Sequence, residues 1–185
     1  MAATQQGSSP HLKILFVGPE GVGKKHHSSY CPPTVGVRIL EYDDSAAHQG
    51  KSYDDSVQLW DCSGAQTWEN CFPALAKDVG GVVYVYNPEL PEQTDALEYW
   101  YDRFGPRSLG LPPQSFMICQ MLKSNQMRDY VVPTKISFAS IQQPLTMTWE
   151  NAAAKMKPAF DKYLGKVYKT VQERQRQEEE DVMKM

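Results

Sequence analysis

The sequence lacks the usual features of a membrane-anchored or secreted chain. No apolar run approaches the ~20 residues that a membrane-spanning helix needs. Residues 1–10 contain no apolar signal core, and position 2 is Ala2 rather than the glycine that is myristoylated. Residues 182–185 include no cysteine for prenylation. We therefore expect no membrane anchor.

Excess positive charge and closely spaced cysteines are missing as well. The formal net charge is −3, which argues against a dedicated nucleic-acid surface. The four cysteines have no spacing typical of a metal or redox site, so we expect buried free thiols in a reducing compartment. With 41% hydrophobic and 22% charged residues, the remaining composition is ordinary for one globular domain.

Strand and helix patterns alternate along the chain. We expect a flexible polar tail at 1–11, one domain at 12–171 and a charged helical extension at 172–185. Short apolar runs predict strands at 12–17, 35–42, 57–60, 81–86, 116–119 and 135–139. Helices are predicted at 67–78 with an interruption at Pro73, at 91–104 and at 149–174, with a loop at 105–113. This order predicts an α/β fold with a mostly parallel six-stranded sheet and helices on both faces.

A glycine-rich loop follows the first expected strand. Residues 18–25 read Gly-Pro-Glu-Gly-Val-Gly-Lys-Lys, which matches the Walker phosphate-binding pattern except at its last position. The pattern requires serine or threonine there to bind magnesium, whereas the Lys25 ammonium has no lone pair to offer a metal. The predicted nucleotide-binding residues of this loop are Gly18, Glu20, Gly21, Val22, Gly23, Lys24 and Lys25.

A second motif comes at the end of the third expected strand. Residues 61–64 read Asp-Cys-Ser-Gly, in which Asp61 would hold magnesium through a water and the Gly64 N–H would contact a third phosphate. Thr34 stands in a Pro-Thr-Val-Gly segment, where a threonine completes the magnesium shell. The alternative is that Asp61 caps a turn and that Thr34 is an ordinary loop residue.

These motifs, in this order, resemble the Ras superfamily, and within it the Rab-like GTPases of intraflagellar transport. The segments that carry the resemblance are 33–41, 59–64 and 73–78, together with Trp100 and Tyr101. It extends from about Lys13 to the C-terminal helix. The resemblance implies a three-layer P-loop small-GTPase fold with GTP and magnesium as ligands.

The same resemblance implies a place in the intraflagellar transport B complex, the train that carries cargo in cilia. A member of this family would bind coiled-coil subunits of that complex, with no nucleic acid and no lipid anchor. It would act in the assembly of the cilium or flagellum, and would occur there, in the cytoplasm and near the basal body.

The interval between the phosphate loop and Thr34 departs from the family pattern. Only residues 25–33 lie between Lys24 and Thr34, too few for a full helix and a switch loop, and Pro32 and Pro33 would stop any helix before them. We therefore expect the first helix to be shortened or missing, which would weaken phosphate binding because a helix N-terminus normally stands behind the loop.

Two further departures concern hydrolysis and base selection. Ala65 follows Gly64 where hydrolytic GTPases place a water-orienting glutamine, so hydrolysis would be slow unless Gln66 substitutes. The guanine-reading Asn-Lys-x-Asp motif is missing after the fifth strand, where the chain reads Gln-Met-Leu-Lys with a cation at Lys123.

The leading hypothesis is an atypical Rab-like GTPase that acts as an interaction subunit, with bound nucleotide holding the switch segments in shape. Its partner surface would be the switch region, where aromatic and arginine side chains are typical interface anchors. The predicted partner-binding residues are Arg38, Ile39, Leu40, Trp60, Trp68 and Phe72. The alternatives are a GTP-hydrolysing switch enzyme and a nucleotide-free scaffold.

Overall fold

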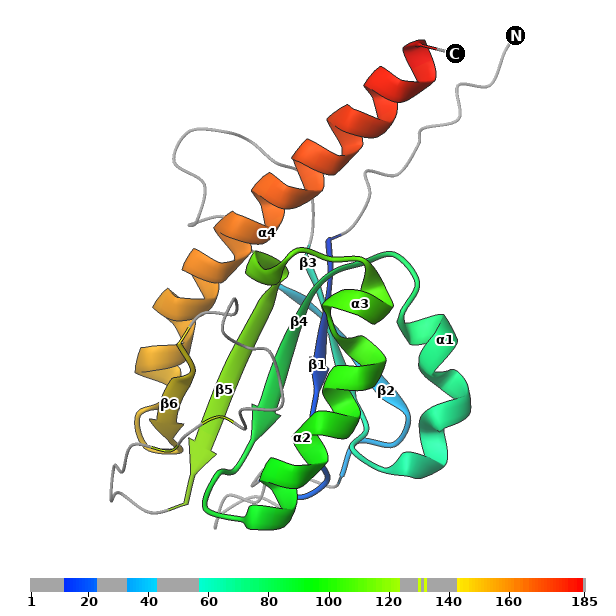
Figure 1. Cartoon of the computed structure of the whole chain (residues 1–185). Helices are drawn as coiled ribbons and strands as arrows, with labels where there is room; N and C mark the ends of the chain where they lie inside the picture. Colours follow the sequence, from blue (N-terminus) through cyan, green and yellow to red (C-terminus); the bar gives the residue numbers. More distant parts are fainter. Residues whose placement is uncertain are drawn as a thin grey trace, which may run out of the picture.

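A single six-stranded sheet organises the chain (Figure 1). The computed structural model describes residues 12–22, 33–42, 57–123, 130, 132 and 143–184. The strands run in the order β2-β3-β1-β4-β5-β6, and every neighbouring pair is parallel except the antiparallel β2–β3 pair. Their bounds are β1 Leu12–Val17, β2 Val37–Tyr42, β3 Val57–Cys62, β4 Val79–Tyr86, β5 Phe116–Leu122 and β6 Leu145–Thr148. The predicted α/β class with a mostly parallel sheet is confirmed.

The sixth strand is the main difference from the sequence prediction. β6 pairs in parallel with β5, with Cys119 opposite Leu145. Its sequence, Leu-Thr-Met-Thr, is only four residues long and half polar, so the pattern gave no signal for a strand. The strand predicted at 135–139 lies outside the described residues.

The helices agree with the prediction in part. α2 spans Pro91–Phe104, as predicted. The predicted loop at 105–113 is wrong in part, because the short helix α3 occupies Pro106–Leu109. The 67–78 segment forms a 3-10 helix, η1 (Gln66–Cys71), and then α1 (Phe72–Leu75), and Pro73 stands in the first turn of α1, where proline is tolerated. A second 3-10 helix, η2, occupies Pro113–Ser115.

The last helix, α4, spans Ala152–Met183. It starts three residues after the predicted first residue and continues into the segment 172–185, for which a charged helical extension was expected. Every described side chain from 172 onward is exposed, and this end of the helix projects beyond the sheet (Figure 1). The i,i+4 pairs Arg174–Glu178 and Arg176–Glu180 line its surface at 3.9 and 3.8 Å. Along the described residues no helix has the length and apolar character to cross a bilayer.

Helices cover both faces of the sheet. On one face α1, α2 and α3 pack against side chains such as Leu15 and Val17 of β1. On the other, α4 packs against Leu12 and Ile14 of the same strand. The alternation of side chains along β1 therefore divides the core into two clusters.

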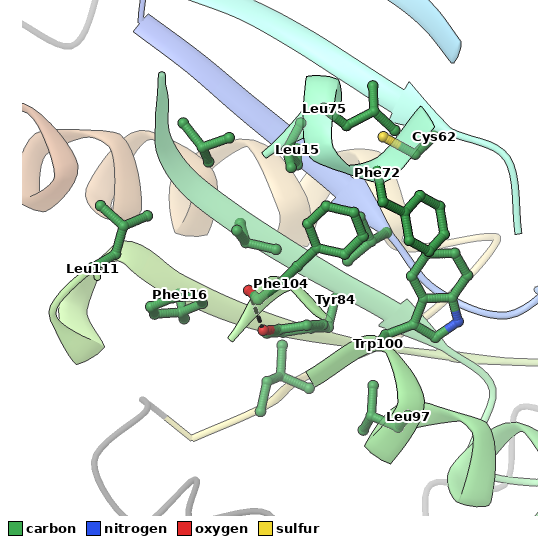
Figure 2. Packing of buried hydrophobic residues seen from close by; sticks show 14 of the residues in the cluster. Leu15, Cys62, Phe72, Leu75, Tyr84, Leu97, Trp100, Phe104, Leu111 and Phe116 are labelled. Atoms are coloured by element: carbon green, nitrogen blue, oxygen red, sulfur yellow. Dashed lines mark hydrogen bonds between the residues drawn. The ribbon is translucent and has the colours of Figure 1, made fainter. Parts of the chain in front are cut away.

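The cluster under α2 is rich in aromatic rings (Figure 2). The Phe72 ring lies 5.5 Å from the Trp100 ring and 5.0 Å from the Phe104 ring, measured between centroids. Tyr84 is fully buried in β4, and its hydroxyl donates a hydrogen bond of 2.8 Å to the Phe104 carbonyl. Burial raises the pKa of Tyr84 far above its ordinary value. These contacts hold α2 firmly on the sheet, and the N-terminus of α2 lies next to the site described below.

Candidate functional site

The phosphate loop follows β1 directly, and its first residue, Gly18, lies against Val85 of β4. Gly18 has a positive φ of 156°, and a Cβ placed there would lie 1.9 Å from the Val85 carbonyl oxygen. Only glycine allows the loop to approach β4 this closely. Gly21 also has a positive φ, 75°, in open space. Gly23, Lys24 and Lys25 lie outside the described residues, so the described loop ends at Val22.

The two glycine motifs meet directly. A Cβ at Gly64 would lie 2.5 Å from the Glu20 nitrogen and 2.6 Å from the Pro19 carbonyl carbon. The backbone after β3 therefore packs on the backbone of the phosphate loop, although more than forty residues separate them in the chain. The predicted proximity of these two segments agrees with the geometry.

Gln93, in the first turns of α2, was missed by sequence reasoning. Its Nε2 donates a hydrogen bond of 3.1 Å to the Glu20 carbonyl, while its Oε1 accepts one of 2.8 Å from the Asn87 N–H. Gln93 is only 5% exposed, and Asn87 is fully buried. The side chain therefore ties the phosphate loop to the β4–α2 connection. The only available signal was a polar residue on the apolar face of a predicted helix.

Asp61 lies near the end of β3 and is surrounded by donors from the segment before it. The Thr34 hydroxyl donates a hydrogen bond of 2.8 Å to Asp61 Oδ2, and the Arg38 Nη2 lies 2.9 Å from the same oxygen. The carboxylate is mostly covered, with 15% of its side-chain surface exposed. Thr34 and Asp61 are thus brought together as predicted, and Asp61 belongs to a strand rather than to a turn.

One cavity connects these segments. Its volume is ≈ 1110 Å³, and its lining includes the phosphate loop from Gly18 to Val22, Thr34, and the 61–64 segment. Among the described residues, its far end is formed by the ends of β5 and β6 and the start of α4, and these residues are apolar apart from one lysine: Met121, Lys123, Met147, Trp149, Ala152, Ala153 and Met156. The Lys123 N–H donates a hydrogen bond of 2.6 Å to Glu89 Oε2. The cavity is large, and it is polar at the end formed by the phosphate loop and apolar at the other end. These properties suit a nucleotide, which has charged phosphates and a flat base.

The residues after Gly64 lead away from the cavity. Gln66 is exposed, begins η1, and is not among the described residues that line the cavity. Trp68 is half-buried, and its ring lies 3.6 Å from where a Gly36 Cβ would be. The Ser63 N–H donates a hydrogen bond of 2.8 Å to the Gly36 carbonyl. The segment around Thr34 is therefore packed between β3 and η1.

The predicted partner-binding residues fall into two groups. Arg38, Ile39 and Leu40 lie on β2, where Ile39 and Leu40 are 47% and 46% exposed. Phe72, by contrast, is a core residue at 7% exposure, so its side chain is not offered to a partner in this fold. Its place just after a polar 3-10 helix concealed this, because the rings that cover it come from α2, almost thirty residues later.

Trp60 is half-buried and covered by a lysine. The Lys13 Nζ lies 3.9 Å from the centre of the Trp60 ring and donates a hydrogen bond of 2.9 Å to the Lys77 carbonyl. Burial lowers the pKa of Lys13. This cation–π contact covers one face of the Trp60 indole, so Trp60 is packed within the sheet.

The donor set at Asp61 does not fit the magnesium shell that the family pattern implies. Asp61 Oδ2 already accepts two hydrogen bonds, one of them from a guanidinium. In the sequence, Lys25 replaces the hydroxyl ligand. No group of three or more His, Cys, Asp or Glu side chains suited to a metal ion occurs within the described part of the chain.

Comparison with known proteins places the chain among ciliary transport proteins. No family model matches it. The zebrafish protein named intraflagellar transport protein 22 homolog is 33% identical, over 93% of this chain and 98% of that protein. The cattle protein of the same name is 30% identical, over 92% of this chain and 97% of its own length.

Solved structures agree on the fold. The crystal structure titled T. brucei IFT22/74/81 GTP-bound has a TM-score of 0.66 and 23% identity, covering 86% of this chain and 96% of the other. The GDP-bound T. brucei IFT22 structure has a TM-score of 0.61, also at 23% identity, covering 90% of this chain and 99% of the other. With two animal relatives that match it over nearly their whole length, this chain belongs to the intraflagellar transport protein 22 family.

Proposed function

We propose that this chain is an atypical Rab-like small GTPase that binds GTP and acts as an interaction subunit of the intraflagellar transport B complex. The support comes from the zebrafish and cattle relatives, which are named for intraflagellar transport, and from the trypanosome structure, whose title names GTP, 74 and 81. The chain would act in the assembly of the cilium or flagellum and occur there, in the cytoplasm and near the basal body.

The observation that carries the nucleotide part of the proposal is the contact between Gly64 and Glu20 at the rim of one cavity. It aligns the 61–64 segment with the phosphate loop, so that both can face the same phosphate chain. Gln93 of α2 stabilises this arrangement through its hydrogen bond to the Glu20 carbonyl. A phosphate loop whose backbone is held on two sides needs little reorganisation to bind a phosphate.

The enzyme alternative requires a group that orients water, and the chain offers little for this task. Ala65 carries only a methyl group. Gln66 is the first residue of η1 and does not line the cavity. Hydrolysis would therefore be slow, and bound nucleotide would serve to hold shape rather than to be turned over. The scaffold alternative is favoured by Lys25, which replaces the magnesium-binding hydroxyl of the sequence motif, and by Arg38, which pairs with Asp61.

The partner surface proposed is the edge of the sheet at β2. Val35, Ile39 and Leu40 are apolar and 76%, 47% and 46% exposed, respectively, and they lie close to one another in the chain. Because side chains alternate along a strand, Leu40 shares its face of β2 with Arg38, and Ile39 lies on the other face. An exposed apolar side chain beside an arginine is typical of an interface. The apolar stripe of a coiled coil is a partner of matching chemistry.

Calorimetric titration of the purified chain with GTP, and with ATP as the control, tests nucleotide binding. We expect GTP to bind with a Kd in the range of about 1 µM, a binding free energy near −8 kcal/mol. GTP and ATP binding alike would contradict guanine selectivity, and no heat with either would leave the nucleotide-free scaffold as the function.

Co-purification with the orthologues of the trypanosome partners 74 and 81 tests the interaction role. Leu40→Ser should reduce the yield of the complex at least about tenfold, because it places a hydroxyl in an apolar contact. Val182→Ser is the matched control, since Val182 is 73% exposed at the far end of α4. An unchanged complex with Leu40→Ser, or no complex with wild type, would contradict the proposed surface or the proposed role, respectively.

A further inference from the structure

We propose that the Arg38 guanidinium takes the place of magnesium as the positive charge next to Asp61. This chain would therefore bind nucleotide without a magnesium ion held by Asp61 and Thr34. This inference rests on the proposed nucleotide binding and says which group neutralises the Asp61 carboxylate in the phosphate site. It follows from the misfit between the donors at Asp61 and a magnesium shell.

The sheet itself positions the guanidinium. Arg38 and Asp61 are directly opposite in the antiparallel β2–β3 register. Side chains of opposite residues in such a pair point to the same face of the sheet, close enough for a long side chain to reach across. The Nη2–Oδ2 distance of 2.9 Å is that of a charge-assisted hydrogen bond. The pairing is thus built into the strand register and does not depend on a loop.

The chemistry of the two cations separates them. A guanidinium remains protonated at every pH at which the protein is folded, so its charge is permanent. Magnesium demands nearly octahedral oxygen ligands at about 2.1 Å and retains several waters, which need acceptors in turn. Asp61 Oδ2 already accepts hydrogen bonds from Arg38 and from the Thr34 hydroxyl. A divalent ion held by Asp61 would therefore lie close to a fixed positive charge and compete with it for the same carboxylate.

The environment favours the Arg38 guanidinium. Only 15% of the Asp61 side chain is exposed, whereas 53% of the Arg38 side chain is. The carboxylate thus gains a partner without complete desolvation of the guanidinium, the arrangement in which an ion pair is least costly. The same carboxylate holds Thr34, so the segment from Thr34 to Arg38 is closed on β3 by one acceptor.

Nucleotide affinity with and without divalent cation tests the inference. Titration with GDP is carried out in magnesium buffer and in EDTA, for wild type and Arg38→Gln. We expect the wild-type Kd to change less than about threefold between the buffers, and the Arg38→Gln Kd to weaken at least about tenfold in EDTA because magnesium then becomes the only counter-ion. A wild-type Kd that weakens tenfold in EDTA overturns the proposal, as does an Arg38→Gln variant with no response to magnesium.

Two variants control for charge and for folding. Arg103→Gln removes another arginine that is paired with a carboxylate, Glu69, on the surface of α2, and should behave as wild type. Arg38→Lys keeps the charge and should keep magnesium independence, even if the loss of the planar fork weakens the contact. If Arg38→Lys needs magnesium as Arg38→Gln does, a cation at this position is not what replaces the metal, and the proposal is wrong.

A second measurement needs no nucleotide and separates this inference from the proposed function. Thermal unfolding of the ligand-free chain is compared for wild type, Arg38→Gln, Asp61→Asn and the double variant. Paired groups give a double variant no less stable than the less stable single variant, whereas independent groups give additive losses of melting temperature. If no nucleotide binds to wild type, the proposed function fails, and coupling or additivity in this cycle still decides whether Arg38 and Asp61 form the pair.

Discussion

β4 and β2 both contact residues of the candidate site, but they are held in opposite ways. Seven of the eight residues of β4 are buried, and its Val85 carbonyl lies against Gly18 of the phosphate loop. No residue of β2 is buried, and four of its six are exposed. The phosphate side of the site is thus fixed by core packing, which deforms little, whereas the switch side is fixed by contacts at the surface.

Besides its pairing with β3, β2 is held by polar side-chain contacts at its two ends. At one end Arg38 pairs with Asp61. At the other, the Tyr42 hydroxyl donates a hydrogen bond of 2.9 Å to Asp161 Oδ1 of α4 and accepts one of 3.2 Å from Lys157. Burial is the main cause of the raised pKa of Tyr42. Because such polar contacts contribute little net free energy each, a ligand or partner can replace them.

The largest expected difference between the two regions is in stability. Phe104→Ala removes a fully buried ring in contact with Phe72 and Trp100, and should cost about 3–5 kcal/mol. Leu40→Ala on β2 should cost less than about 0.5 kcal/mol because the side chain is 46% exposed. Urea unfolding monitored by circular dichroism measures both, and similar losses would mean that β2 is as tightly packed as the core.

The next largest effect concerns the glycine that brings the phosphate loop to β4. Gly18→Ala places a Cβ 1.9 Å from the Val85 carbonyl oxygen and should destabilise the chain by about 3 kcal/mol. Any GTP binding should be lost with it. Gly165→Ala in the middle of α4 is the control, because no described atom outside the adjacent helix backbone lies within 4 Å of its added Cβ, and it should stabilise by about 0.5–1 kcal/mol. Thermal unfolding of the two variants checks this; a stable, nucleotide-binding Gly18→Ala would contradict the contact.

A smaller effect compares two tyrosine hydroxyls. Tyr84→Phe leaves the buried Phe104 carbonyl without its donor and should cost about 1–2 kcal/mol. Tyr42→Phe at the end of β2 should cost about 0.5 kcal/mol, since solvent can replace its partners. Equal losses in chemical denaturation would show that the β2 anchor is dry rather than solvated.

The smallest effect is chemical rather than energetic and concerns two thiols. Burial raises the pKa of Cys119 to about 12, while Cys71 is exposed at the end of η1. Iodoacetamide reacts with thiolates, so in the folded chain at about pH 8 Cys71 should be modified and Cys119 should not. Peptide mass mapping before and after unfolding measures this. Because the unfolded Cys119 ionises near its ordinary pKa of about 8.5, stability should fall as the pH rises above that value.

The sequence predicted best where short-range pattern and packing agree. β1 and α2 have the predicted bounds because apolar periodicity, the Asn-Pro turn and the proline at the start of α2 all act locally. β6 was missed because its four residues owe their conformation to pairing with β5 and not to their own composition. The core position of Phe72 was missed for the same reason, since α2 covers it from far along the chain.

At the site, the motifs predicted which segments meet but not how their side chains are occupied. Gly18 and Gly64 both stand where the backbone approaches another segment closely, and Gly64 is in contact with Glu20. Thr34 and Asp61 are in contact, and Arg38, which was predicted to bind a partner, also pairs with Asp61. Nothing in the spacing indicated this, because it depends on which residues the β2–β3 register places opposite each other.

The sequence alone thus determined the fold class, the order of strands and helices in the central part of the chain, and the family. Periodicity and glycine-rich motifs are local properties of the chain, which is why they could be interpreted without the structure. Only the tertiary structure decided that Gln93 holds the phosphate loop and that Arg38 neutralises Asp61. Both are contacts between residues far apart in the chain, and their partners are selected by strand register and helix packing, which no single segment encodes.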